Sequence, residues 1–323
     1  MKLILTLILV CRGFILIAQE CDPAMLAKLP GKWKTARQGS INNVTATDLQ
    51  KEKTVLNTIY NMVTTDYKLE GVVIDYSFVF SKYGETKWYG DPYSLNMYIL
   101  AYLCDPNDPE KKKYYVSVSS ATNVSVMVNH SSNLDLYAAL LEPDDIRGYL
   151  RMEKRPEKRN GYWYLGQKVV SDRGTNHETI SYEYLITYND TLPFLYLSRR
   201  EYLLIQRKRL ENSIKSDGST SYKEYMDRID KHLQMPEQEL AKPAICMVND
   251  EERFNGFVEE GTKGSFIAIK PNPDYFRKNL PLSSPQFFNL VFKVTTNYPV
   301  YESSVAGIEK SLDIQKLRAM LGH

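Results

Sequence analysis

The stretch GVVIDYSFVF, residues 71–80, decides the fold class. Its apolar side chains fall at every second position, and Asp75 and Ser77 fall between them; the apolar set is Val72, Ile74, Tyr76, Phe78 and Phe80. Successive side chains of a β-strand point to opposite faces of a sheet. This alternation, with its β-branched and aromatic residues, therefore predicts a strand with one face in a core.

Further strand-like runs follow, at 95–104, 113–120, 123–129, 134–141, 148–154, 161–170 and 180–188. Polar turns separate them and no helical pattern intervenes, so we expect antiparallel pairing in a sandwich, an open barrel or a curved sheet. One helix, 48–64, precedes the sheet, because apolar residues there recur at three- and four-residue steps. Thr47 and Gln50 have the spacing of a capping box at its start.

The pattern changes near residue 199, where Ser198 and Glu201 form a second capping box. Helices are predicted from there, from residue 221 and over 303–321, and strands at 264–270 and 286–295. We therefore predict an α+β fold. Residues 19–198 form an antiparallel β-sheet-rich region with one packed helix, and residues 199–323 form a helix-rich region with two further strands. The two regions can also be one continuous domain.

Residues 1–18 have the features of a secretory signal peptide, with Lys2, an apolar run and the small residue Ala18. A transmembrane anchor is the alternative, but Arg12 interrupts the run, and roughly 17 to 25 apolar residues are needed to span a bilayer. We therefore expect an exported protein, periplasmic or extracellular, without a transmembrane anchor in the mature chain.

The composition excludes several classes of function. Removal of residues 1–18 leaves 39 basic and 39 acidic side chains, and a net charge near zero argues against a nucleic-acid partner. Cys21, Cys104 and Cys246 then remain, so at most one disulfide can form between two of them. The chain has four histidines and no C-x-x-C motif. We therefore expect neither a metal site nor a cofactor.

Two groups of residues are candidates for ligand binding. Aromatic residues beside turns, namely Trp88, Tyr89, Tyr162, Trp163 and Tyr164, suit stacking against a sugar or peptide. Alternation puts Tyr162 and Tyr164 on one face and Trp163 on the other, so at least one face must be core and core packing is the favoured interpretation. Arg199 and Arg200, at a helix start, could receive an anion together with the free backbone N–H groups there. The favoured interpretation is that Glu201 caps the helix with Ser198 while one of the arginines pairs with an acidic neighbour.

No catalytic residue is assigned, and an enzyme is not the favoured interpretation. The turns hold titratable residues, namely Glu142, Asp144, Asp145, His177 and Glu178, and Cys246 would need a histidine partner to act as a nucleophile. The chain has no G-x-S-x-G, H-E-x-x-H, P-loop or G-x-G-x-x-G motif. N-glycosylation sequons occur at Asn43, Asn123, Asn129 and Asn189, and they matter only in a eukaryotic secretory pathway.

Three segments carry a resemblance to a known family: DTLPFLYLSRREYLL (190–204), AICMVNDEERFNGFVEEG (244–261) and NLPLSSPQFF (279–288). With the signal peptide, they resemble a family of uncharacterised exported proteins of Gram-negative bacteria. The resemblance implies export and an α+β build, and no activity. The segment LPGKW, ending at Trp33, resembles the Gly-x-Trp motif of lipocalin-like barrels, which implies a closed barrel around a small apolar ligand. The helix that follows departs from the lipocalin pattern.

These observations leave three hypotheses about function. The first is a non-catalytic binding or envelope-associated protein that takes a carbohydrate, a peptide or an envelope component on an aromatic sheet face. The second is a secreted hydrolase with a carboxylate pair or His177. The third is a lipocalin-type carrier of a small ligand.

Overall fold

The computed structural model describes residues 21–34, 37–42, 44–81, 90–110, 112–130, 149–159, 161–171, 178–218, 222–248 and 253–323. The predicted signal peptide, the strand predicted at 134–141 and the candidates Trp88 and Tyr89 lie outside these residues. None of the helices in the described ranges is long and apolar enough to cross a membrane.

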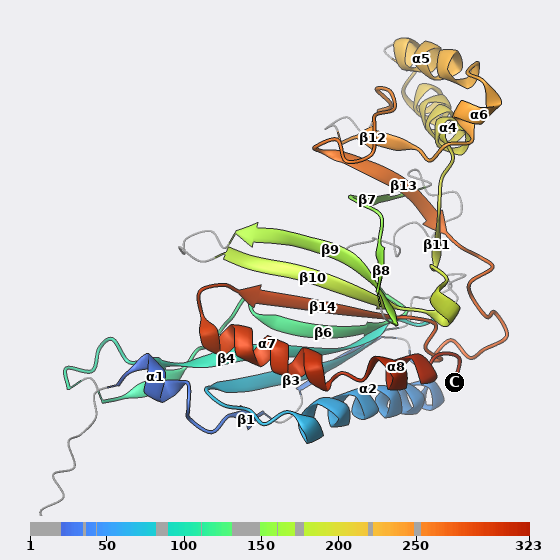
Figure 1. Cartoon of the computed structure of the whole chain (residues 1–323). Coiled ribbons are helices and arrows are strands. Elements are labelled where there is room, and N and C mark those ends of the chain that lie inside the picture. Colours follow the sequence, from blue (N-terminus) through green and yellow to red (C-terminus); the bar gives the residue numbers. More distant parts are fainter. Residues whose placement is uncertain are drawn as a thin grey trace, which may run out of the picture.

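A ten-stranded sheet forms the base of the molecule (Figure 1). Its main path runs β1-β3-β4-β6-β14-β10-β9-β8, with β2 beside β3 and β5 beside β4. The pairings are antiparallel, except that β1 and β2 run parallel to β3, so the sheet is mixed. The strands are Lys32–Trp33 (β1), Arg37–Asn42 (β2), Val72–Ser81 (β3), Tyr93–Cys104 (β4), Tyr114–Val116 (β5), Asn123–Val128 (β6), Glu157–Arg159 (β8), Tyr162–Ser171 (β9), Glu178–Ile186 (β10) and Phe288–Thr295 (β14).

Helices cover one face of this sheet (Figure 1): α2 (Ala46–Asp66), α7 (Pro299–Ser311) and α8 (Ile314–Ala319). The strands turn every second residue toward them, and these side chains form the main core, which includes Leu95, Met97, Ile99, Val124, Val126, Leu290 and Phe292. The Thr45 side chain caps α2 by accepting from the Asp48 N–H at 3.1 Å. The cap therefore lies two residues before the predicted cap at Thr47, and the helix begins at Ala46.

A second, four-stranded sheet stands beyond β9, in the upper part of Figure 1. Its order is β11-β13-β12, with β7 beside β13. The strands are Leu150–Met152 (β7), Phe194–Tyr196 (β11), Ile245–Met247 (β12) and Ser265–Pro271 (β13), and the helices α4 (Arg199–Asp217), α5 (Lys223–Leu233) and α6 (Glu237–Leu240) complete this upper unit. Its core includes Tyr202, Leu203, Ile229, Leu240, Phe254 and Phe266.

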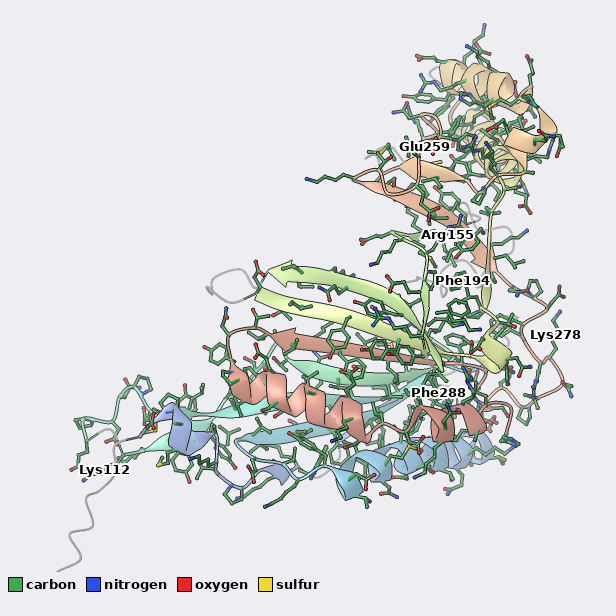
Figure 2. The ribbon with its side chains drawn as sticks, viewed as in Figure 1. Lys112, Arg155, Phe194, Glu259, Lys278 and Phe288 are labelled. Carbon is green, nitrogen blue, oxygen red and sulfur yellow. A yellow bond between two sulfur atoms is a disulfide. The ribbon has the colours of Figure 1, made fainter. Side chains whose placement is uncertain are left out.

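A third apolar cluster joins the two sheets. Leu185 contributes to it from β10 and Phe287 from the residue directly before β14, and Phe194 and Ile269 contribute from the second sheet. Figure 2 shows Phe194 at this junction, between the large sheet and the upper unit, whereas Phe288 lies within the large sheet. The two sheets are therefore connected by packed side chains as well as by the chain itself.

The predicted fold class is wrong, because it assigned an antiparallel sheet to residues 19–198 and a helix-rich region to residues 199–323. The large sheet is mixed, and its strand β14 comes from the C-terminal third yet lies between β6 and β10. Helices α7 and α8 also come from that third and pack on the large sheet, while β7 leaves its sequence neighbours for the second sheet. Alternation in the sequence indicates that a segment is a strand, but it does not say which strand will be its partner.

Trp33 does not close a barrel among the described strands. It lies on β1 at one end of the large sheet, with ring centroids 5.6 Å from Tyr60 and 6.3 Å from Tyr76. Within the described ranges no pairing joins this end to β8 at the other, so these strands form an open sheet. The closed barrel that a lipocalin-type carrier requires is therefore not the arrangement of these strands.

One disulfide links Cys21 to Cys104, with the two Cα atoms 5.7 Å apart. It fastens the start of the short helix α1 (Pro23–Leu26) to the end of β4. Cys246, on β12, is a free thiol and is buried. Of the three pairings that the sequence left open, the structure therefore has the one between Cys21 and Cys104.

Candidate functional site

A cavity of about 590 Å³ lies between the two sheets. Strands β9 and β10 of the large sheet form one side, and β7, β13 and the turn at 261–264 form the other. Its charged side chains include Arg151, Lys154 and Lys168 as cations and Glu153 and Glu183 as anions. The volume is within the range of about 300–1,000 Å³ that small-molecule sites occupy.

Two buried polar residues of β10, Ser181 and Glu183, form part of the cavity wall. They are 2% and 3% exposed, and strand alternation places them on the face that looks away from the helical layer. The Asn289 side-chain amide donates to Glu183 Oε2 at 3.2 Å. Glu183 Oε1 and Ser181 Oγ have no hydrogen-bond partner among the described residues. Since buried polar groups are normally paired, these two unpaired atoms single out Ser181 and Glu183 as the candidate ligand-binding groups of the cavity.

Burial raises the pKa of the Glu183 carboxyl group above its ordinary value. The Asn289 hydrogen bond and the charges of Lys168 and Lys293 oppose this effect without cancelling it. Removal of a carboxylate from water disfavours its charged form, which is the cause of the shift. Glu183 is thus a carboxyl group that gains from any ligand able to stabilise its negative charge.

A β-bulge shapes the cavity wall opposite Glu183. Along β10 and β9, Glu183 pairs with Gly166 and the next residue, Tyr184, pairs with Tyr164, so Leu165 is the extra residue. Gly166 has φ +105°, a conformation that glycine adopts without strain. A Cβ there would lie 2.4 Å from Lys154 Cε. Because Gly166 has no side chain, the side chain of Lys154 can pass directly over the backbone at this residue.

Ser181 lies in a cross-strand row between two lysines. It pairs with Lys168 on β9 and with Lys293 on β14. Side chains directly opposite in neighbouring strands have Cβ atoms about 4.5–5.5 Å apart and lie on the same face of the sheet. The Ser181 hydroxyl thus has a lysine on the neighbouring strand at each side. Glu183 lies two residues further along β10, on the same face of the sheet.

The second sheet supplies the other side of the cavity through Arg151 and Phe266. The Arg151 guanidinium lies 4.8 Å from the centroid of the Phe266 ring, which also stacks on Tyr149 with centroids 6.0 Å apart and planes 7° apart. Arg151 is therefore held against an aromatic ring, and its charge borders the cavity.

The predicted aromatic residues of β9 lie on the two faces of the large sheet. Tyr162 and Tyr164 pack beside Tyr184 on the helical side, with centroids 4.5 Å and 5.8 Å from its ring. Trp163 packs in the cluster between the two sheets, and its buried Nε1 has no hydrogen-bond partner within the described ranges. The structure thus separates Trp163 from its two neighbours, as the alternation of the strand requires.

Tyr162 does line a second, smaller cavity of about 370 Å³, beside α7. Glu309 is the carboxylate of this cavity, and both of its oxygens are occupied. Tyr182 Oη donates to one oxygen at 2.8 Å and Tyr184 Oη donates to the other at 2.6 Å. Both oxygens of this carboxylate are thus hydrogen-bonded within the protein, in contrast to Oε1 of Glu183.

The two predicted arginines are paired with acidic residues of α6. Arg199 Nη1 donates to Glu239 at 2.9 Å, its guanidinium lies 4.9 Å from the Phe257 ring centroid, and Arg200 forms an ion pair with Glu237. The capping box of α4 is present, with Ser198 and Glu201 each bonded to the other's backbone N–H. The arginines thus hold α6 against the start of α4.

The remaining candidates are placed as follows. Glu142, Asp144, Asp145 and His177 lie outside the described residues, and Glu178 is exposed on β10. Burial raises the pKa of the Cys246 thiol to about 12, which keeps it protonated and unreactive at neutral pH. Asn129 is buried, and its side-chain amide donates to the carbonyl groups of Asp91 and Ser284, so this sequon is enclosed in the fold.

The site residues Ser181 and Glu183 were not among the candidates from the sequence. The strand predicted at 180–188 does put them on one face, opposite Tyr182 and Tyr184. A polar face of a strand ordinarily meets solvent, so the pattern alone gave no reason to select them. The signal that could have found them is a carboxylate in the middle of a strand whose other face is aromatic.

The chain was compared with protein-family models, with curated proteins and with solved structures. None of the three comparisons found a match. The resemblance to exported proteins of Gram-negative bacteria accordingly remains an expectation, and the candidate function rests on the geometry of the site.

Proposed function

We propose that the protein is a non-catalytic binding protein that holds a small polar ligand in the cavity between its two sheets. One observation carries the proposal: the cavity is lined by two buried side chains, Ser181 and Glu183, that each have an oxygen without a partner among the described residues. An unsatisfied buried polar group costs on the order of 1–3 kcal/mol. A ligand that supplies the missing hydrogen bonds recovers that free energy.

The experiment combines a ligand screen with a variant that fills the cavity. Val248 lines the cavity and is 54% exposed, so Val248→Trp adds bulk there without opening a core. Val118, 93% exposed and not among the lining residues, gives the matched control Val118→Trp. Thermal shift with polar metabolites should reveal a ligand whose affinity falls at least about tenfold in the first variant and is unchanged in the second. Equal affinity in both variants would contradict the proposal.

A secreted hydrolase is the second candidate, because two carboxylates, Glu153 and Glu183, line the same cavity. Glycoside hydrolysis uses such a pair, and an acid with a raised pKa suits the role of proton donor. Chromogenic glycosides tested on the wild type and on Glu183→Gln separate the two candidates. Turnover that the substitution abolishes would favour the hydrolase, and binding without turnover would favour the binding protein.

Export is part of the proposal, and the bond between Cys21 and Cys104 supports it, because disulfides persist mainly in oxidising compartments. Fractionation of cells that express the full chain, with mass spectrometry of the alkylated protein, tests this. A bonded Cys21 in the exported fraction is expected. A cytosolic protein with all thiols reduced would refute export.

A further inference from the structure

We propose that the ligand is an α-amino acid, bound with its ammonium group on Glu183 and its carboxylate at Ser181 between Lys168 and Lys293. This inference rests on the proposed binding function and names its ligand class. It follows from three observations: a buried carboxylate whose Oε1 lacks a donor within the described ranges, a buried hydroxyl whose cross-strand neighbours are two lysines, and the short spacing of these groups.

Glu183 selects the cationic end of the ligand. Its Oε2 is held by Asn289, and its Oε1 has no partner in the described part of the chain, so the carboxylate is oriented and can still accept at least one hydrogen bond. A primary ammonium group has three N–H donors and a positive charge, and both compensate a buried carboxylate. A phosphate or an uncompensated carboxylate at this position would be repelled by Glu183.

Ser181 selects the anionic end. Its buried Oγ has a hydrogen atom to donate and no acceptor for it among the described residues, and its two cross-strand neighbours are Lys168 and Lys293. A carboxylate above Ser181 would accept from the hydroxyl beside Lys168, which lines the cavity, and Lys293 adds positive charge from the neighbouring strand. Charge-assisted hydrogen bonds of this kind are about twice as strong as neutral ones.

The spacing of the two residues favours a short zwitterion. Ser181 and Glu183 are successive residues on one face of β10, which places them roughly 6.8 Å apart along the strand. Hydrogen bonds of about 2.8–3.0 Å from each side chain to the ligand leave little length between its charged ends. In an α-amino acid a single carbon atom separates the ammonium and carboxylate groups, so one molecule can reach both side chains.

The aromatic content of the cavity disfavours a sugar. Among the described lining residues Phe266 is the aromatic one, and its ring already stacks on Tyr149 and carries the Arg151 guanidinium. Sugar rings are commonly held by an open aromatic face. The side chain of the bound amino acid would instead extend toward the exposed lining residues Gln167, Val248 and Thr262.

The test is isothermal titration calorimetry on the mature chain, with the twenty common amino acids in pools at about 1 mM. The best amino acid is then compared with its N-acetyl and its C-terminal amide derivatives. Each derivative removes one charge, and each should lose at least about tenfold in affinity. Glu183→Gln should lower the affinity for the amino acid at least as much and leave the N-acetyl derivative unaffected. Lys168→Met should weaken the amino acid and leave the amide unaffected.

The controls separate this inference from the proposed function. Glu178→Gln changes an exposed carboxylate of the same strand and should bind like the wild type. The inference is overturned if the N-acetyl derivative binds as tightly as the amino acid. It is also overturned if no amino acid binds. In that case the binding function still stands if a sugar or an anion binds to the wild type and binds more weakly to Val248→Trp. Amino-acid binding that Val248→Trp does not weaken would refute both.

Discussion

Gly166 lies directly opposite Glu183 across the β9–β10 pair, at the residue where the register of the two strands shifts. At this bulge the backbone of Gly166, whose positive φ favours glycine, the Lys154 side chain that passes over it and the buried Glu183 carboxyl group lie together. Bulges of this kind redirect side chains beside functional sites. This relationship makes Gly166 the position at which backbone geometry and ligand binding can be separated by experiment.

Gly166→Val should reduce both stability and binding. The substitution strains a backbone at φ +105°, at a cost of about 1–3 kcal/mol, and displaces Lys154. Gly256→Val is the matched control, because Gly256 has φ +124° and a Cβ there would meet no atom of the described residues within 4 Å. Urea unfolding and calorimetry should show destabilisation in both variants and a loss of affinity only in the first. Equal affinities would mean that the bulge has no part in the site.

Glu183→Gln should stabilise the protein at neutral pH. Because the pKa of Glu183 is raised in the fold, its contribution to stability is fully present below the unfolded value of about 4.3 and is lost as the pH rises through the folded value. Glutamine does not ionise, so the variant avoids that loss. Its free energy of unfolding in urea should therefore exceed that of the wild type at pH 7, and the difference should shrink toward pH 4. Glu178→Gln, at an exposed position of the same strand, should show no such trend.

Glu201→Ala should destabilise the protein by about 0.5–2 kcal/mol, since it removes the capping box of α4. Glu201 also forms an ion pair with Lys270 on β13, so the loss should fall toward the upper end of that range. Arg200→Ala is the comparison, because it removes an exposed ion pair, which is worth about 0–1 kcal/mol. If the arginine variant proves the more costly in urea unfolding, the capping explanation is wrong.

Replacement of Cys21 and Cys104 by serine should lower the free energy of unfolding by about 4–5 kcal/mol in the chain-entropy model, because the bond closes a long loop with a sequence separation of 83. Denaturant unfolding of the variant and of the reduced wild type should agree. Cys246→Ser does not open a loop and serves as the control for the loss of a thiol. A variant as stable as the wild type would show that the bond constrains little.

The sequence predicted most strands and helices, because their periodicities are local. Residues 180–188 show both the success and its limit. The alternation there placed Ser181 and Glu183 together on one face, but whether that face meets water depends on β7 and β13, which the chain supplies from distant segments. Periodicity describes one element at a time, and the site exists only where two sheets meet.

Two other features lay beyond sequence reasoning for similar reasons. Nothing in the sequence marks Gly166 as the site of a bulge, because a bulge depends on the register with the partner strand. The partner of Arg199 is Glu239, forty residues further along the chain. The sequence therefore predicted that an acidic residue pairs with an arginine here, but it did not show which acidic residue.

Strand β14 has a consequence for how the protein is made. It pairs with β6 on one side and with β10 on the other, so among the described strands it is the one that connects the two halves of the large sheet. A chain still emerging from the ribosome exposes the open edges of β6 and β10 until residues 288–295 are synthesised. Unpaired strand edges invite association with other chains. The large sheet is therefore completed only after residues 288–295 have been made. Until then, a chaperone that shields the two edges would have its greatest effect on yield.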